Sequence, residues 1–208
     1  MVGENAVINL PAWETLPHER LSPKPDTVTA RFKALYKINK GKTKVVVCSV
    51  RALLQPIISN DLSSTSITIS SKSNFIMSEL VKLLIKFGYS RSDLVERRGD
   101  FAVRGGILDL FPADKEHPIR IDFFGDEIDD LSYFSISDQR SINKIEGELI
   151  IYPCRELLID DNLKQKAKSL GDEFPEIREL TDKVAEGIYF EGIESLAAGL
   201  VENFKMLL

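Results

Sequence analysis

The strongest constraint on the fold is a run of four short segments in which apolar and polar residues alternate. The segments are DFAVR (100–104), GILDLF (106–111), IRIDFF (119–124) and EIDDLSYF (127–134). Gly-Gly, PADKEHP and GDE separate them, and all three are turn-forming sequences. Alternation with a period of two predicts strands whose side chains point to opposite faces of a sheet. The short connections predict an antiparallel meander.

An amphipathic helix is expected just before the meander, over FIMSELVKLLIKFGY (75–89). Gly88 stands where a helix commonly ends in a left-handed residue. A Ser/Lys-rich stretch, SSKSN, marks a boundary near residue 72. Residues 73–142 are therefore predicted to form a small α+β domain, with one helix packed on one face of an antiparallel sheet.

The flanking thirds of the chain predict α/β structure. Residues 25–38 have the apolar spacing of a helix. Residues 44–50 are a continuous apolar run, which is typical of a strand buried on both faces of a parallel sheet. A short helix is expected at 51–57 and a second strand at 65–70. After residue 142, a strand is expected at 147–153 and helices over 161–187 and 193–208. The last pattern has no stop signal, so we expect a fragment of a longer protein.

Charge and composition exclude several classes of protein. Residues 1–72 carry ten Lys and Arg against five Asp and Glu, 73–142 nine against thirteen, and 143–208 eight against fourteen, so only the first third is basic. A dedicated DNA-binding domain is usually basic overall. No apolar run is long enough for a membrane span, and no signal peptide is predicted. Cys48 and Cys154 are expected to be reduced thiols in a cytoplasmic protein.

Catalytic, cofactor and metal sites are not predicted. Gly41-Lys42-Thr43 lacks the first glycine of a phosphate-binding loop, and it follows a helix and precedes a strand, which is the reverse of the required order. His18 and His117 have no nucleophile at a suitable spacing. The paired carboxylates Asp129-Asp130 and Asp160-Asp161 are typical of surfaces and turns.

The segment IRIDFF carries an unusual second face. Ile119, Ile121 and Phe123 form a core face, whereas Arg120, Asp122 and Phe124 share the other. An aromatic side chain beside a charged pair is a composition typical of binding hot spots. The alternative is that Phe124 packs under a loop and the charges pair across strands. Arg104 joins this set if its strand lies near IRIDFF.

Residues Gly88 to Ser141 strongly resemble a module of the bacterial transcription-repair coupling factors, which the excinuclease protein UvrB shares in similar form. PAWETLPHERLSP and VRALLQP upstream, with PCRELL and EGIESL downstream, are similar to the coupling factors rather than to UvrB. The resemblance implies part of a degenerate helicase-like (RecA-like) α/β domain, formed by residues 1–72 and 143–208. Into it the small domain of residues 73–142 is inserted.

The same resemblance implies that the inserted domain binds UvrA, another protein of the excinuclease. The matching positions are Arg91, Arg104, Arg120, Asp122 and Phe124. Where UvrB carries a further arginine, this chain has Ala102, so fewer charge contacts are expected. The hypothesis requires the side chains at 104, 120, 122 and 124 to project together into water.

In the family, RNA polymerase and DNA bind to domains absent here, and the Walker motifs of the ATP-driven motor are missing from this sequence. We therefore expect no enzymatic activity and no cofactor. The alternative function is a fragment of an ATP-dependent DNA translocase, which would bind DNA with a steep salt dependence.

Overall fold

The chain folds into two compact units joined by two crossings of the backbone. The computed structural model describes residues 7–16, 19–41, 43–55, 57 and 66–201. The first unit combines Met1–Leu62 with Arg155–Leu208, and the second is the continuous segment Ser63–Cys154. The architecture is mixed α/β with several sheets, and the second unit is an insertion within the first.

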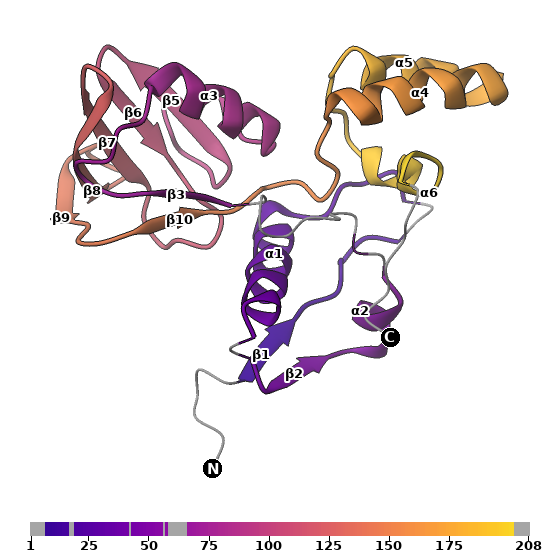
Figure 1. The fold of residues 1–208 in the computed structure, drawn as a ribbon, viewed down its shortest axis with the longest axis horizontal. Coiled ribbons are helices and arrows are strands. Elements are labelled where there is room, and N and C mark those ends of the chain that lie inside the picture. Colours follow the sequence, from indigo (N-terminus) through magenta and orange to yellow (C-terminus); the bar gives the residue numbers. More distant parts are fainter. Residues whose placement is uncertain (1–6, 17–18, 42, 56, 58–65, 202–208) are drawn as a thin grey trace. The chain divides into compact units, whose positions relative to one another are not determined.

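The second unit is built on a six-stranded sheet in the order β4-β5-β6-β7-β8-β9 (Figure 1). Its strands are β4 (Ser90–Arg91), β5 (Asp100–Arg104), β6 (Ile107–Leu110), β7 (Ile119–Phe124), β8 (Glu127–Phe134) and β9 (Ser141–Lys144). All neighbouring pairs from β5 to β9 are antiparallel, which confirms the predicted meander, and the short edge strand β4 pairs in parallel with β5.

The turn between β5 and β6 explains why two glycines stand together. Arg104 pairs with Ile107, so Gly105 and Gly106 form a two-residue hairpin loop, and Gly105 has a φ of 60°. A Cβ atom on Gly106 would lie 3.0 Å from the carbonyl oxygen of Phe123 on β7. One glycine therefore provides the left-handed backbone and the other allows a close approach between neighbouring strands.

A separate two-stranded ribbon closes the second unit. In it β3 (Ile67–Ile69) pairs antiparallel with β10 (Leu149–Ile151), and Ile67 lies opposite Ile151. The expectation that residues 65–70 join an α/β layer with the preceding strand is wrong, because their partner lies more than 75 residues further along the chain. The ribbon brings the entry and exit of the unit side by side (Figure 1).

The main core of the second unit lies on the face of the sheet that α3 covers (Figure 1). The predicted helix is α3 (Met77–Lys86), and Gly88 after it has a φ of 82°, as the left-handed helix end requires. Fully buried side chains come from the helix and from alternating positions of the strands: Leu80, Leu84, Phe101, Leu108, Leu110, Ile119, Ile121, Ile128 and Leu131. Alternation therefore identified the core face correctly.

The first unit contains a parallel β-α-β arrangement. Strands β1 (Val7–Leu10) and β2 (Val45–Cys48) pair in parallel, with α1 (Pro25–Asn39) between them in sequence and α2 (Val50–Leu54) after them. The strand β1 was not predicted. The parallel pairing of β2 was predicted. The prediction that β2 is buried on both faces was wrong, because Val45, Val46 and Val47 are exposed.

The return segment of the first unit is helical, as expected. It contains α4 (Asp161–Glu173), a short helix η2 (Pro175–Ile177), α5 (Arg178–Ala185), η3 (Ile193–Leu196) and α6 (Ala197–Leu200). Its buried residues form one cluster that includes Leu157, Leu163, Ala167, Val184 and Ile193. Residues 202–208 of the predicted last helix lie outside the described part of the chain. None of the described helices has the length and apolar character needed to cross a membrane.

Candidate partner-binding surface

Strand register gathers most of the predicted binding residues on one face of the six-stranded sheet. Across β5, β6 and β7, Arg104 lies opposite Ile107, and Ile107 lies opposite Asp122. One row further, Asp109 lies opposite Arg120. Arg104, Asp122 and Arg120 therefore share a face, opposite to the face that carries the core. Phe124 follows on the same face of β7 at the hairpin end.

A bulge in β8 preserves this separation of faces. Asp122 pairs with Asp130 but Phe123 pairs with Ile128, so Asp129 is an extra residue on β8. Ile128 and Leu131 are three residues apart and both are fully buried, which strict alternation would not allow. The extra residue lets both of them face the core while β7 stays regular.

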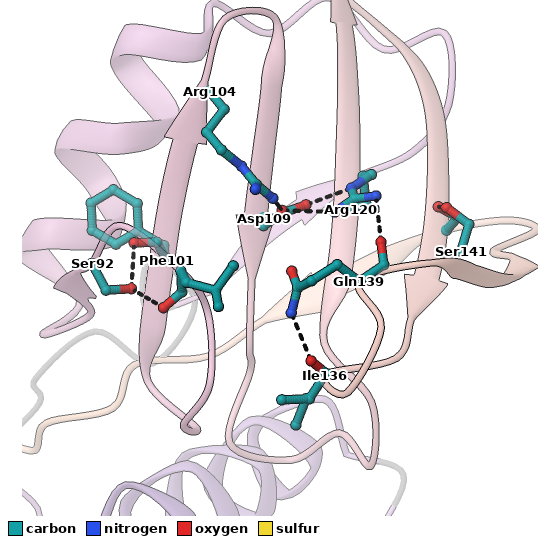
Figure 2. A network of polar contacts seen from close by, with 10 residues as sticks. Ser92, Phe101, Arg104, Asp109, Arg120, Ile136, Gln139 and Ser141 are labelled. Carbon is teal, nitrogen blue, oxygen red and sulfur yellow. Dashed lines mark hydrogen bonds and ion pairs between the residues drawn. The ribbon is translucent and has the colours of Figure 1, made fainter.

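Asp109 is the centre of a charged network on the same face of the sheet as Arg104 and Arg120 (Figure 2). Its Oδ2 accepts hydrogen bonds from Nη2 of Arg104 at 2.5 Å and from Nη2 of Arg120 at 3.0 Å. Its Oδ1 accepts one from Nε of Arg120 at 2.8 Å. The carboxylate side chain is only 1% exposed, so a buried negative charge is balanced by two arginines from the strands on either side.

Arg120 is held on all sides by the protein itself. Its Nη1 donates to the backbone oxygen of Gln139 at 3.1 Å, and its guanidinium lies 4.8 Å from the ring centroid of Phe134. The hydrogen bond to Asp109 raises the pKa of Arg120, so the side chain stays charged. With 16% of its side chain exposed, Arg120 offers a partner little free surface.

One end of this face is covered rather than open. Val95, Ala102, Phe111 and Phe134 form a buried cluster there. Ala102, the position at which UvrB was expected to carry an arginine, is 1% exposed within this cluster. A small apolar side chain is therefore part of a packed layer, directly opposite Asp109 in the register.

The other predicted residues differ in exposure. Phe124 is 82% exposed, so it does not pack under a loop, and the side chain of Arg104 is 47% exposed. Arg91 is exposed on the edge strand, but it pairs with Phe101, whose side chain belongs to the core face. The structure thus brings together Arg104, Arg120, Asp122 and Phe124, and it leaves Arg91 apart. The required projection into water holds for Arg104 and Phe124; Asp122 is partly buried, and Arg120 is mostly covered.

Asp122 lies among other carboxylates. Partial burial raises the pKa of Asp122; Arg120 opposes this effect, and Asp130, Asp109 and Asp129 add to it. Asp130 is directly opposite on β8 and forms an ion pair with Lys144 at 3.1 Å. The surface therefore joins an arginine, an exposed phenylalanine and an acidic edge.

Sequence reasoning missed Asp109. In GILDLF its position indicated only that it faces away from the core, and its burial depends on neighbouring strands and on the segment that carries Gln139. Gly41 lies between α1 and β2, as expected of an ordinary turn. Among the residues that the structure describes, no group of three or more potential metal ligands comes together.

Comparison with known proteins connects this domain to DNA repair. Residues 67–157 match the family model described as "UvrB interaction domain". The chain is 41% identical to the transcription-repair-coupling factor of Mycobacterium tuberculosis over 98% of its own length, and 30% identical to that of Escherichia coli over 92%. It is also 31% identical to UvrABC system protein B of Fervidobacterium nodosum, over 70% of its length.

These relatives are much longer than the chain. It spans 18% of the M. tuberculosis protein, 17% of the E. coli protein and 22% of the F. nodosum protein. The similarity to the coupling factors extends through both compact units, whereas the family model covers mainly the inserted one. The chain therefore belongs to the transcription-repair coupling factor family, and its residues 67–157 match the model of a UvrB interaction domain.

Proposed function

We propose that this chain is a recruitment module of transcription-coupled nucleotide excision repair, which binds the excinuclease protein UvrA. The binding surface is the face of β5, β6 and β7 that carries Arg104, Arg120, Asp122 and Phe124. Membership of the coupling factor family and the match to a UvrB interaction domain support a protein-protein role in repair. The proposal requires neither a cofactor nor a metal ion.

The exposure of Phe124 is the observation that carries the proposal. A phenylalanine that is 82% exposed at the end of a well-packed sheet has no role in its own core. Aromatic residues, phenylalanine included, and arginine are enriched in the buried centres of protein–protein interfaces. Arg104 keeps about half of its side chain exposed and presents a planar set of donors suited to a carboxylate. Charges around the phenylalanine set the register of docking and the association rate.

Outside the inserted unit, the fold of the first unit is consistent with the same role. The β1-α1-β2 arrangement with parallel strands supports the assignment of the first unit to a helicase-like α/β domain. We place contacts with RNA polymerase and DNA, and an ATP-dependent motor, in the parts of the protein beyond this chain. We also propose that the protein acts in the cytoplasm.

The test is a calorimetric titration of the 208-residue chain with UvrA. We expect binding by the wild-type chain, and a loss of about 2 kcal/mol, or roughly 30-fold in Kd, for Phe124→Ala and for Arg104→Ala. The loss arises because each substitution removes a side chain that projects from the surface.

Matched controls lie in the other compact unit. Phe174→Ala removes a phenylalanine that is 42% exposed, and Arg178→Ala removes an exposed arginine, so both should bind like the wild type. Circular dichroism should show that all four variants are folded. Wild-type affinity in both Phe124→Ala and Arg104→Ala would refute the assignment of this surface.

A further inference from the structure

We propose that Asp109 is a positioning residue for the binding surface: itself anchored by Arg120, it holds the guanidinium group of Arg104 in a fixed orientation. This inference rests on the proposed function, because Arg104 is positioned for a partner. Nothing in the sequence of β6 marks Asp109 for such a role. It follows from where the register places the carboxylate.

The first argument is the cost of burying a carboxylate. A charge that is 1% exposed is destabilising unless it is paired and hydrogen-bonded. Asp109 meets this condition with three hydrogen bonds from two arginines. If this position served only for packing, an apolar side chain would be sufficient, as Leu108 and Leu110 are on the opposite face. The carboxylate is therefore explained by the arginines that it holds.

The second argument is geometry. Arg120 pairs directly with Asp109 across the ladder, whereas Arg104 reaches it diagonally from two residues further along β5. The residue of β5 directly opposite Asp109 is Ala102, which has no polar side-chain atom to compete for the carboxylate. Both oxygens of Asp109 are thus engaged by Arg104 and Arg120, as Figure 2 shows.

The third argument is the difference in exposure between the two arginines. Arg120 also contacts the backbone of Gln139 and the ring of Phe134, so it has several partners and is mostly covered. Arg104 is half exposed, and it forms an ion pair with Asp109. A flexible arginine must lose side-chain freedom when it binds, at a cost that reduces affinity. Asp109 lowers this cost by ordering Arg104 before the partner arrives.

The experiment is a double-mutant cycle with UvrA as the probe, measured on the full 208-residue chain. The four proteins are wild type, Asp109→Asn, Arg104→Ala and the double variant. Asp109→Asn keeps the shape of the side chain but removes its charge. We expect it to weaken binding about five- to tenfold when Arg104 is present, and less than about twofold when Arg104 is alanine.

Two controls separate positioning from a general loss of structure. Asp182→Asn makes the same change of charge on α5 in the other unit and should bind like the wild type. Thermal unfolding should show that Asp109→Asn is folded at the titration temperature. If it is not, NMR of arginine side chains in the wild-type chain provides a direct measurement. We expect hindered rotation of the Arg104 guanidinium, and free rotation would overturn the inference.

The outcomes distinguish this inference from the proposed function. If Arg104→Ala weakens binding but Asp109→Asn does not, the surface binds UvrA and Asp109 has no positioning role. An equal effect of Asp109→Asn with and without Arg104 would also overturn the inference, because the coupling to Arg104 would be absent. If the wild-type chain does not bind UvrA at all, the proposed function fails, and the NMR measurement still decides whether the Arg104 guanidinium is held in place.

Discussion

Asp122 illustrates a residue whose charge is unfavourable in the folded chain. It faces Asp130 directly across the ladder, and like charges in that arrangement are destabilising. Burial and the neighbouring carboxylates raise the pKa of Asp122 in spite of Arg120. A raised pKa means that the folded state disfavours the ionised form. The stability cost is therefore present at neutral pH and disappears as the pH falls below the ordinary pKa of an aspartate.

Replacement of Asp122 by asparagine should therefore stabilise the inserted unit. We expect the free energy of unfolding to rise by about 0.2–1 kcal/mol at pH 7, since one member of a like-charged pair is removed. The gain should shrink as the pH is lowered and vanish near pH 3, where the aspartate is protonated in both states. Urea unfolding at several pH values measures this. A constant or growing advantage at low pH would contradict the assignment.

At the scale of elements, a buried ion pair joins segments of the first unit that are far apart in sequence. Arg31 of α1 donates to Glu156 in the return segment, and Nε1 of Trp13 donates to the same carboxylate oxygen at 2.9 Å. Arg31 also binds the backbone oxygen of Pro11 and lies over the Trp13 ring. These contacts hold the proline-rich loop against the helix, and both charged side chains are buried.

Removal of one partner should be costly because it leaves the other charge buried. We expect Glu156→Ala to lower the free energy of unfolding of the first unit by about 3–5 kcal/mol. The fluorescence of Trp13, the single tryptophan of the chain, reports on this site during urea unfolding. The double variant Arg31→Met, Glu156→Leu replaces the pair by apolar groups and should recover much of the loss. If the double variant is as unstable as Glu156→Ala, the loss of stability does not come from leaving Arg31 buried without its partner.

At the scale of the whole molecule, the insertion is a continuous compact unit of the chain. The β3–β10 ribbon places Ile67 next to Ile151, so the chain enters and leaves the unit at one point. Domains whose termini lie close together tolerate excision and insertion well. Nothing in the proposed binding surface comes from the first unit.

The isolated segment 63–154 should therefore fold and bind UvrA like the full chain. We expect one cooperative unfolding transition and a Kd within about threefold of the value for the full chain. Calorimetric titration of the two proteins measures the difference, with Phe124→Ala in the short segment as the control for the surface. A folded segment with much weaker affinity would show that residues outside it contribute to binding.

Local patterns predicted most of the elements. The bounds of β5, β7 and β8 match the alternating segments, and α1 and α3 match the segments with helical spacing. Non-local pairing was less predictable. The strand at 67–69 found its partner at 149–151 rather than in the parallel layer, and β1 was not anticipated. A pattern of alternation specifies which residues share a face of a strand, but it does not specify which strand lies beside it.

By itself, the sequence determined which side chains of IRIDFF share a face, because a side-chain period of two is a local property of a strand. The family also followed from the sequence, through its resemblance to the coupling factors. Only the tertiary structure decided which residues on the outer face are open to water. Phe124 stands at a hairpin end and is exposed, whereas Arg120 and Asp109, two rows away, are covered by their neighbours and bound to each other. The reason is physical: burial depends on the register between strands and on the segment that packs over them, and both are set by contacts between residues distant in sequence.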